Sequence, residues 1–347
     1  MHLTRNNYST TREQVQAASC YASFKFILQS SLPLHLKTMF KWRSPFLLGL
    51  VAYSYCLLSI TVTAKETSND ASHKFKVFGL GPGRSGTDSL RAALIRLGFG
   101  PSYHMKEILF EEAGISTGDH IKLWHQLALE TDEEQKSKDL KTMLDPWSSG
   151  GDWPLSAFPM ELLNAYPDAK FILTVRSPKK WYQSVSNTIC NIAGRDNWFM
   201  PIVRKIPIFP FNRFKAQAPM VNEVNRYAFD GKDFGYMCDP NNAEDTMKLY
   251  EDWNAKIKKM IPRNQLLVFE TGKDSYKELA SFLKVPVPDE PYPNSNSTKE
   301  MKLIIFRMKT TAFAAIVCSA FILVIILLEI RHFFAVRRIN MKKTKSE

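Results

Sequence analysis

Residues 76–90 read "KVFGLGPGRSGTDSL", and this stretch decides the fold. An apolar run passes into four glycines within eight residues, and a helix-forming run follows them: the glycines are Gly79, Gly81, Gly83 and Gly86. Glycines let backbone N–H groups converge on one point, and a helix start adds unpaired N–H donors with a partial positive charge. The stretch therefore predicts a strand, an anion-binding loop and a helix, with phosphate or sulfate as the anion.

Strand and helix patterns alternate after this loop, which is typical of a parallel sheet covered on both faces. The helix that follows the loop has its apolar residues on one face and ends at Gly98. The stretch between Asn191 and Asn242 has no clear period, and predicts a long lid or binding loop. The patterns predict strands at 74–80, 169–175 and 264–270, and helices at 119–142, 156–166, 179–193, 243–261 and 274–285.

The formal net charge of +12 comes from the two ends of the chain. Residues 65–302 carry 32 Lys or Arg and 31 Asp or Glu, so the central region is nearly neutral. A domain that binds nucleic acid is expected to be basic itself, so the sequence indicates no nucleic-acid partner. Cys190 and Cys238 lie in the central region, and they form either one disulfide in an oxidising compartment or two buried thiols.

Two uncharged runs, at 44–64 and 311–328, are each long enough to cross the core of a lipid bilayer. The bias of basic residues predicts that both ends face the cytoplasm and that the central region is lumenal. The first run is either a signal anchor or a cleaved signal peptide, and translation starts at Met1 or Met39. The expected organisation is an N-terminal cytoplasmic or upstream extension (1–43), a signal anchor or signal peptide (44–64), a lumenal domain (65–303), a transmembrane helix (304–330) and a basic cytoplasmic tail (331–347).

At least three families build a loop of this kind. The spacing from Gly81 to Gly86 satisfies the dinucleotide fingerprint, but the acidic residue about 20 positions on is Glu107, which does not follow a strand. A nucleotide-hydrolysing P-loop needs Lys and then Ser or Thr after its last glycine, where this chain has Thr87 and Asp88. Both interpretations are therefore weak.

The third family fits these departures. "GRSGTDSL", in which Arg84 precedes Ser-Gly-Thr, resembles the loop that binds the 5′-phosphosulfate in sulfotransferases. "VRSPKKWYQSVSN" resembles their second motif, in which an Arg at a strand end and a Ser eight residues later bind the 3′-phosphate; these are Arg176 and Ser184. The resemblance to the sulfotransferase-like P-loop family covers roughly residues 75–296. It implies a three-layer α/β P-loop fold with a central parallel sheet, flanked by one or two transmembrane helices.

The resemblance also implies a donor, 3′-phosphoadenosine 5′-phosphosulfate (PAPS), and no metal. Transfer of its sulfuryl group needs placement and charge neutralisation more than covalent chemistry, and Arg84 is expected to neutralise the leaving phosphate. Asp88 departs from the usual small or polar residue and is expected to cap the helix. The residues implied to bind the donor are Gly83, Arg84, Ser85, Gly86, Thr87, Asp88, Arg176 and Ser184.

Transfer to a hydroxyl or amine also needs a general base. His104, in "SYHMKE", falls about where the lumenal tyrosyl-protein sulfotransferases carry a catalytic Glu, and Asp152, in "GDWP", is the second candidate. Each has a structural alternative: His104 as a packed histidine, and Asp152 as a cap on the next helix. With Arg84, these residues form the predicted catalytic set.

The sequence therefore predicts a membrane-anchored lumenal sulfotransferase in the Golgi or another secretory-pathway membrane. Its partners are the lipid bilayer and an acceptor that is a glycan, a peptide, a lipid or a small alcohol. The alternatives are a nucleotide-binding membrane protein without catalytic activity and an NAD-dependent oxidoreductase or epimerase.

Overall fold

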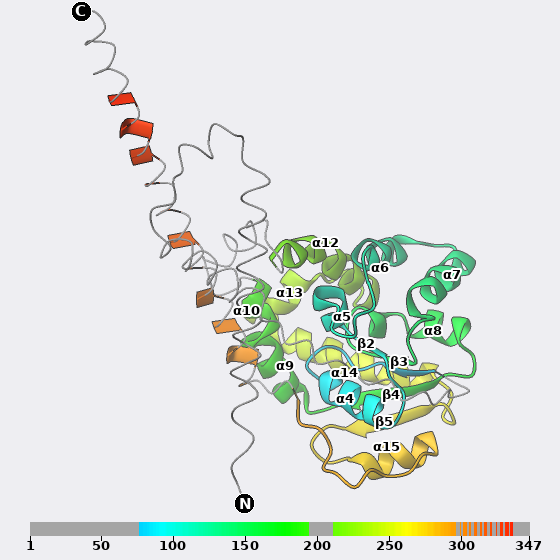
Figure 1. Cartoon of the computed structure of the whole chain (residues 1–347). Coiled ribbons are helices and arrows are strands. Elements are labelled where there is room, and N and C mark those ends of the chain that lie inside the picture. Colours follow the sequence, from blue (N-terminus) through cyan, green and yellow to red (C-terminus); the bar gives the residue numbers. More distant parts are fainter. Residues whose placement is uncertain are drawn as a thin grey trace, which may run out of the picture. The chain divides into compact units, whose positions relative to one another are not determined.

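The computed structural model describes residues 76–193 and 211–295 continuously, with single residues and short runs between 299 and 335 (Figure 1). Contacts divide the chain into two units, residues 63–305 and residues 1–62 with 306–347. The first unit contains a sheet with helices around it. In the second unit, every residue that the structure describes is helical.

The sheet has five strands in the order β2-β3-β1-β4-β5, and every pairing is parallel. The strands are β1 (Val77–Gly79), β2 (Ser102–Tyr103), β3 (Ser149–Gly150), β4 (Lys170–Val175) and β5 (Leu266–Glu270). Because all strands run the same way, their carboxyl ends meet at one edge of the sheet, where ligands of open α/β sheets bind. β1 is the central strand, so the glycine loop that follows it lies in the middle of this edge.

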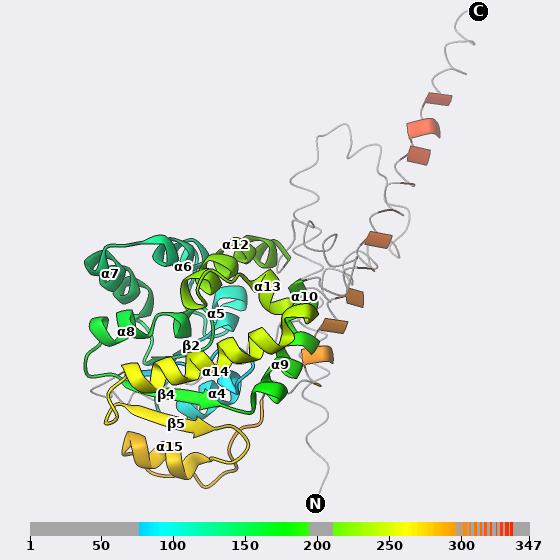
Figure 2. The same ribbon diagram turned by 180° about the vertical axis from the view of Figure 1, so that it is seen from behind.

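Helices cover both faces of the sheet (Figures 1 and 2). Phe171 and Leu173 of β4 pack into a large apolar cluster with residues of α14 (Ala243–Met260). Ile172, between them, packs into a second cluster with residues of α4 (Thr87–Arg96) and α15 (Tyr276–Leu283). Successive side chains of a strand point to opposite faces, so the continuous apolar run of β4 is what a strand buried on both faces requires. The predicted α/β fold with a central parallel sheet is confirmed.

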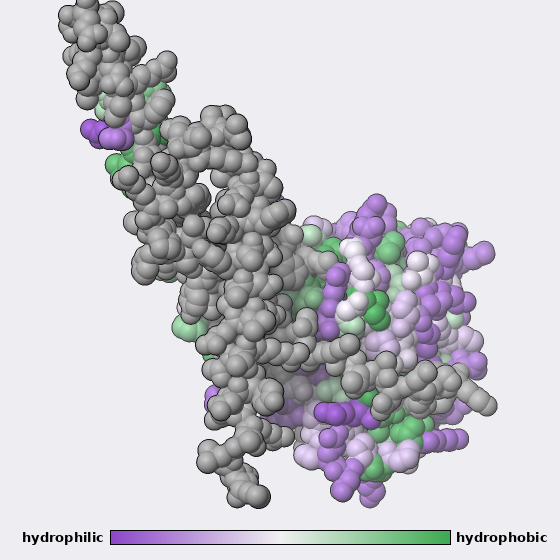
Figure 3. All heavy atoms as spheres, in the orientation of Figure 1, coloured by the Kyte–Doolittle hydropathy of each residue, from purple (hydrophilic) through white to green (hydrophobic). Residues whose placement is uncertain are grey.

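The remaining elements surround this core. They are α5 (Met105–Phe110), α6 (His120–Leu129), α7 (Glu133–Leu144), η1 (Leu155–Ala157), α8 (Pro159–Ala165), α9 (Pro178–Asn187), α10 (Ile189–Ala193), α12 (Phe211–Ala228), α13 (Phe234–Cys238) and η2 (Pro240–Asn242). The face of this unit in Figure 3 carries mostly hydrophilic residues, with small separate hydrophobic patches among them.

The single helix predicted at 119–142 is wrong, because two helices stand there. Glu130 is extended, and Asp132 accepts hydrogen bonds from the N–H groups of Glu134 and Gln135, so a new helix begins. The prediction of a long irregular stretch is wrong for residues 211–228 and 234–238, which form α12 and α13. Its aromatic and basic part before residue 211 lies almost wholly outside the described residues.

Among the residues that the structure describes, no helix combines the length and the apolar character needed to cross a bilayer. The predicted extension (1–43) and first span (44–64) lie wholly outside the described residues. The second span (304–330) and the tail (331–347) lie partly outside them.

Candidate active site

The glycine loop between β1 and α4 accepts no side chain at two of its positions. A Cβ atom at Gly81 would lie 1.9 Å from Oγ1 of Thr174 and 2.8 Å from its carbonyl oxygen. Gly86 has a φ of +108°, and a Cβ there would lie 2.6 Å from Oγ1 of Thr271. These two glycines let the loop pass directly over the carboxyl ends of β4 and β5.

The carbonyl groups of residues 82–85 all accept hydrogen bonds from the protein. In chain order, the donors are the N–H and hydroxyl of Ser85 (3.1 and 2.7 Å), Nε1 of Trp181 (3.0 Å), Nη1 of Arg176 (3.2 Å) and Oγ1 of Thr271 (2.6 Å). With its acceptors satisfied from within, the loop is oriented to offer donors. The N–H groups of Gly86, Thr87 and Asp88 lie at the start of α4, where a helix has no internal acceptors for them.

Ser85 takes a structural place in this arrangement. Its N–H and its hydroxyl both reach the carbonyl of Pro82, and its Oγ lies 2.7 Å from Oγ1 of Thr174. The N–H of Ser85, which was expected among the donor-binding residues, is therefore already bound within the loop.

Arg84, Arg176 and Ser184, which the two sequence motifs singled out, meet at this loop. Nε of Arg84 donates to Oγ of Ser184 at 3.2 Å, and Nη1 of Arg176 donates to the carbonyl of Arg84. Burial lowers the pKa of Arg84, while Asp152 and Asp88 act to raise it. An arginine side chain stays protonated in proteins, so the loop holds a partly buried positive charge.

The α9 helix brings Ser184 to the loop and holds the loop with a second residue. Pro178 is its first residue, where a helix prefers proline, and Ser177 caps it by accepting the N–H of Lys180. Trp181, one turn later, donates to the carbonyl of Gly83.

The Trp181 ring stacks on Tyr250 of α14, with ring centroids 4.3 Å apart and planes 12° from parallel. The hydroxyl of Tyr250 accepts the N–H of Arg176 at 3.0 Å. Trp181 and Tyr250 were missed by sequence reasoning; the one available signal was a large aromatic residue amid the charged and polar residues of "KKWYQS".

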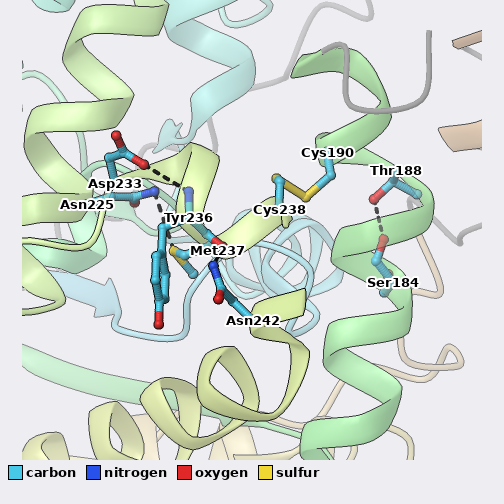
Figure 4. The surroundings of a disulfide bond; sticks show 9 residues. All are labelled: Ser184, Thr188, Cys190, Asn225, Asp233, Tyr236, Met237, Cys238 and Asn242. Carbon is cyan, nitrogen blue, oxygen red and sulfur yellow. Dashed lines mark hydrogen bonds between the residues drawn. A yellow bond between two sulfur atoms is a disulfide. The ribbon is translucent and has the colours of Figure 1, made fainter. Parts of the chain in front are cut away.

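A disulfide joins Cys190 of α10 to Cys238 of α13, with Cα atoms 5.4 Å apart (Figure 4). On the helix just before it, Oγ1 of Thr188 donates to the carbonyl of Ser184 at 2.5 Å. Of the two possibilities that the sequence left open, the structure shows the disulfide. It anchors the segment that carries Ser184.

His104 and Asp152, the two candidate bases, lie side by side against the loop. Nε2 of His104 is 3.3 Å from Oδ2 of Asp152 and 3.4 Å from Oγ1 of Thr87. Oγ1 of Thr87 donates to Oδ1 of Asp152 at 3.2 Å, and this oxygen would lie 3.2 Å from a Cβ atom at Gly83. Asp152 does not cap the next helix, because η1 has no side-chain cap. Burial lowers the pKa of His104, while the charges of Asp152 and Asp88 act to raise it.

Asp88 forms an ion pair with Lys106, with Oδ1 and Nζ 2.8 Å apart. Burial acts to raise the pKa of Asp88, but the nearby His104 and Lys106 hold it below its usual range. The expected helix cap is wrong, because α4 has no side-chain cap at Gly86. Only the backbone N–H of Asp88 is suited to an anion.

Glu107, which the dinucleotide interpretation needs, lies in α5 and pairs with Arg91 at 2.5 Å. It is fully buried and also accepts the N–H of Ala113. A carboxylate bound by these partners cannot bind a ribose. The acidic residue that the dinucleotide interpretation requires is therefore not available. Across the described ranges, no group of three His, Cys, Asp or Glu side chains is placed to hold a metal ion.

The loop and the second motif both lie within the part of the chain that matches a known family. Residues 76–301 match the model of the family described as "Sulfotransferase domain". The Ava biosynthesis cluster protein M of Aspergillus versicolor is 30% identical over 226 residues, which cover 63% of this chain and 80% of that protein. A solved sulfotransferase from Alicyclobacillus acidocaldarius is 16% identical, with a TM-score of 0.33, covering 70% of this chain and 96% of its own.

The family match covers more than half of the chain and contains the whole glycine loop, both arginines and the two candidate bases. The relative is matched over most of its own length. The chain therefore belongs to the sulfotransferase-like P-loop family, and a sulfotransferase activity is the one that its domain supports.

Proposed function

We propose that the protein transfers a sulfuryl group from PAPS to a hydroxyl or amine acceptor. One observation carries this proposal: Arg84, Arg176 and Ser184, from three separate elements, meet at a loop whose carbonyl groups are all bound within the protein. Two cations and an array of N–H donors match a ligand with two phosphate-type groups.

The residues present fit this donor. Gly81 and Gly86 let the loop approach Thr174 and Thr271 more closely than any side chain would allow. At the end of this loop, the N–H groups of 86–88 at the start of α4 would hold the 5′-phosphosulfate. Arg176 and Ser184 would hold the 3′-phosphate.

Arg84 would neutralise the charge that develops as the sulfuryl group leaves the 5′-phosphate. Its position suits this role, because its backbone belongs to the loop, with a φ of +72°, while its side chain reaches Ser184 on α9. The pair His104 and Asp152, in contact with Thr87 at the same loop, would remove the proton of the acceptor.

We also propose that the domain is lumenal and is anchored to the Golgi or another secretory-pathway membrane. Disulfides persist in oxidising compartments, and Cys190 and Cys238 form one. Residues 311–328 carry no charge, and two large apolar residues of this run, Phe313 and Leu328, are 62% and 58% exposed. The acceptor remains one of four classes: glycan, peptide, lipid or small alcohol.

The thermal stability of the full chain tests the donor. Adenosine 3′,5′-bisphosphate, NAD and Mg-ATP are added in parallel, and a ligand at a hundredfold its dissociation constant should stabilise the fold by about 2.7 kcal/mol. We expect the bisphosphate to stabilise the wild type, and Arg176→Ala to remove the shift.

The matched control is Lys248→Ala, which removes an exposed cation of α14 that pairs only within its own helix, with Asp252, in the contacts described. It should leave the shift intact. Stabilisation by NAD alone would mean that the glycines bind a dinucleotide and that the proposal is wrong.

A further inference from the structure

We propose that Asp152 is the group that accepts the proton of the acceptor, and that His104 is a positioning residue, a neutral imidazole that donates to Asp152 from Nε2. This assignment rests on the proposed function, and it divides two roles that the sequence left undivided. It follows from the hydrogen bonds around the two side chains.

The hydrogen bonds of His104 fix which of its ring nitrogens carries the proton. The residue caps α5: its Nδ1 accepts the N–H of Lys106 at 3.3 Å. A nitrogen that accepts an N–H carries a lone pair and no proton, so in the neutral ring the proton is on Nε2. Nε2–H faces Oδ2 of Asp152 and Oγ1 of Thr87. Neither nitrogen of His104 is thus available to take a proton from a substrate.

The charge state of His104 depends on its charged neighbours and on its burial. The charged groups around His104 are Asp152 and Asp88, which favour an imidazolium, and Arg91 and Lys106, which oppose it. Burial is the largest influence, and it lowers the pKa of the ring. A second proton on Nδ1 would also break the cap on Lys106. The imidazole is therefore neutral near pH 7.

The position of Asp152 suits a group that accepts a proton. Its carboxylate accepts from Thr87 and faces His104, which leaves lone pairs on both oxygens. Its side chain is 12% exposed, against 4% for His104, so it is the more accessible of the two. Asp152 has a φ of +69°, a conformation unusual for a non-glycine residue and one that recurs at functional sites. The backbone thus turns this carboxylate toward Gly83 in the loop.

In the proposed reaction, the proton of the acceptor and the sulfuryl group move together. The acceptor oxygen or nitrogen forms its bond to sulfur while its proton passes to Asp152. The bond between sulfur and the bridging oxygen breaks, and its electron pair leaves with the 5′-phosphate, beside Arg84. The products are a sulfated acceptor, adenosine 3′,5′-bisphosphate and a protonated Asp152, which returns the proton to water.

Nuclear magnetic resonance of the full chain, labelled with isotopic nitrogen in histidine, tests the tautomer without any acceptor. The signals absent from His104→Gln identify the ring. We expect a protonated Nε2 and an unprotonated Nδ1 near pH 7, and a smaller doubly protonated fraction at about pH 6 than an ordinary histidine has. A lone pair on Nε2 would make His104 the base and overturn the assignment.

The rate of sulfate release from PAPS to water tests the roles, because water needs no knowledge of the natural acceptor. Asp152→Asn should lose at least about a hundredfold, the scale of general-base catalysis. His104→Gln keeps an N–H toward Asp152 and should lose about tenfold or less, whereas His104→Phe should lose as much as Asp152→Asn. If His104→Gln is as inactive as Asp152→Asn, or if Asp152→Asn remains active, the assignment is wrong.

Binding of adenosine 3′,5′-bisphosphate separates the two possible failures. If the wild type does not bind it, the proposed function fails. If the wild type and Asp152→Asn both bind it but the tautomer is reversed, only the division of roles fails. A wild type that binds it and releases no sulfate contradicts proton acceptance by Asp152 with water as acceptor.

Discussion

At the residue scale, Gly81 determines how closely the loop approaches the sheet. A Cβ atom at Gly81 would overlap Oγ1 of Thr174 and lie within 2.8 Å of its carbonyl oxygen, which β4 holds in place. We expect Gly81→Ala to lower the free energy of unfolding by about 1–3 kcal/mol, the range for overpacking. Urea denaturation measures the change.

Gly118→Ala is the matched control for this substitution. The nearest atom to its added Cβ would be Oγ of Ser116 at 3.9 Å, and its backbone is not in the left-handed region. Its effect should stay within about 0.5 kcal/mol. Equal losses in the two variants would show that the close approach to Thr174 is not what limits position 81.

The lowered pKa of His104 makes stability depend on pH. When pH falls below about 6.5, the unfolded histidine gains a proton that the folded one does not, so the unfolded state is favoured. Stability should therefore fall between about pH 7 and pH 5, and His104→Gln should reduce the slope. Burial lowers the pKa of His120 as well, so His120→Gln should also reduce the slope of stability against pH. A slope unchanged in both variants would show that neither histidine causes the loss of stability in acid.

Single residues also show how far sequence reasoning reaches. Arg84, Arg176 and Ser184 were found because a strand end and a helix start fix their places, and the structure brings them together. Trp181 and Thr271 were not found, although each binds a loop carbonyl. They come from segments about a hundred or more positions away, and no local pattern indicates which side chain will face the loop.

At the element scale, the Cys190–Cys238 disulfide links α10 to α13 across a sequence separation of 48 residues. Closing a loop of this length in the unfolded chain lowers its entropy, and the chain-entropy relation gives about 4 kcal/mol. We expect Cys190→Ser to lose about that much stability in urea without reductant. With excess reductant, the wild type should match the variant. A variant as stable as the oxidised wild type would show that the cysteines are unpaired in solution.

The elements that sequence patterns predicted are those with a strong local signal. β4 is a run of buried apolar residues, and α15 carries a capping box from Ser275 to Glu278. β2 and β3 were missed because each has only two residues, too few for a period to show. The break between α6 and α7 depends on Asp132, whose capping role competes with the helical preference of the residues around it.

At the scale of the whole molecule, the proposed organisation is a folded lumenal domain that is attached to a membrane anchor. In microsomes, the full chain should stay with the membrane after alkaline carbonate extraction, and the domain should resist added protease until detergent opens the vesicle. Removing residues 304–347 tests the second span, and should release the domain only if the first span is cleaved. Digestion of the domain in intact vesicles would place it in the cytoplasm and contradict the lumenal orientation.

The carbonyl groups of residues 82–85 have one more consequence, which concerns transplanting the loop. Its donors come from the loop itself, from α9, from the end of β4 and from the residue after β5. The ten or so residues of the glycine motif thus do not include most of the side chains that bind the carbonyl groups of the loop. Grafted alone onto another strand–helix pair, they would lack the groups that turn their carbonyls away, and the N–H groups would not converge. A sequence motif that includes Trp181 and Thr271 as well as the glycines should therefore distinguish this loop from other glycine-rich loops better than the glycines alone.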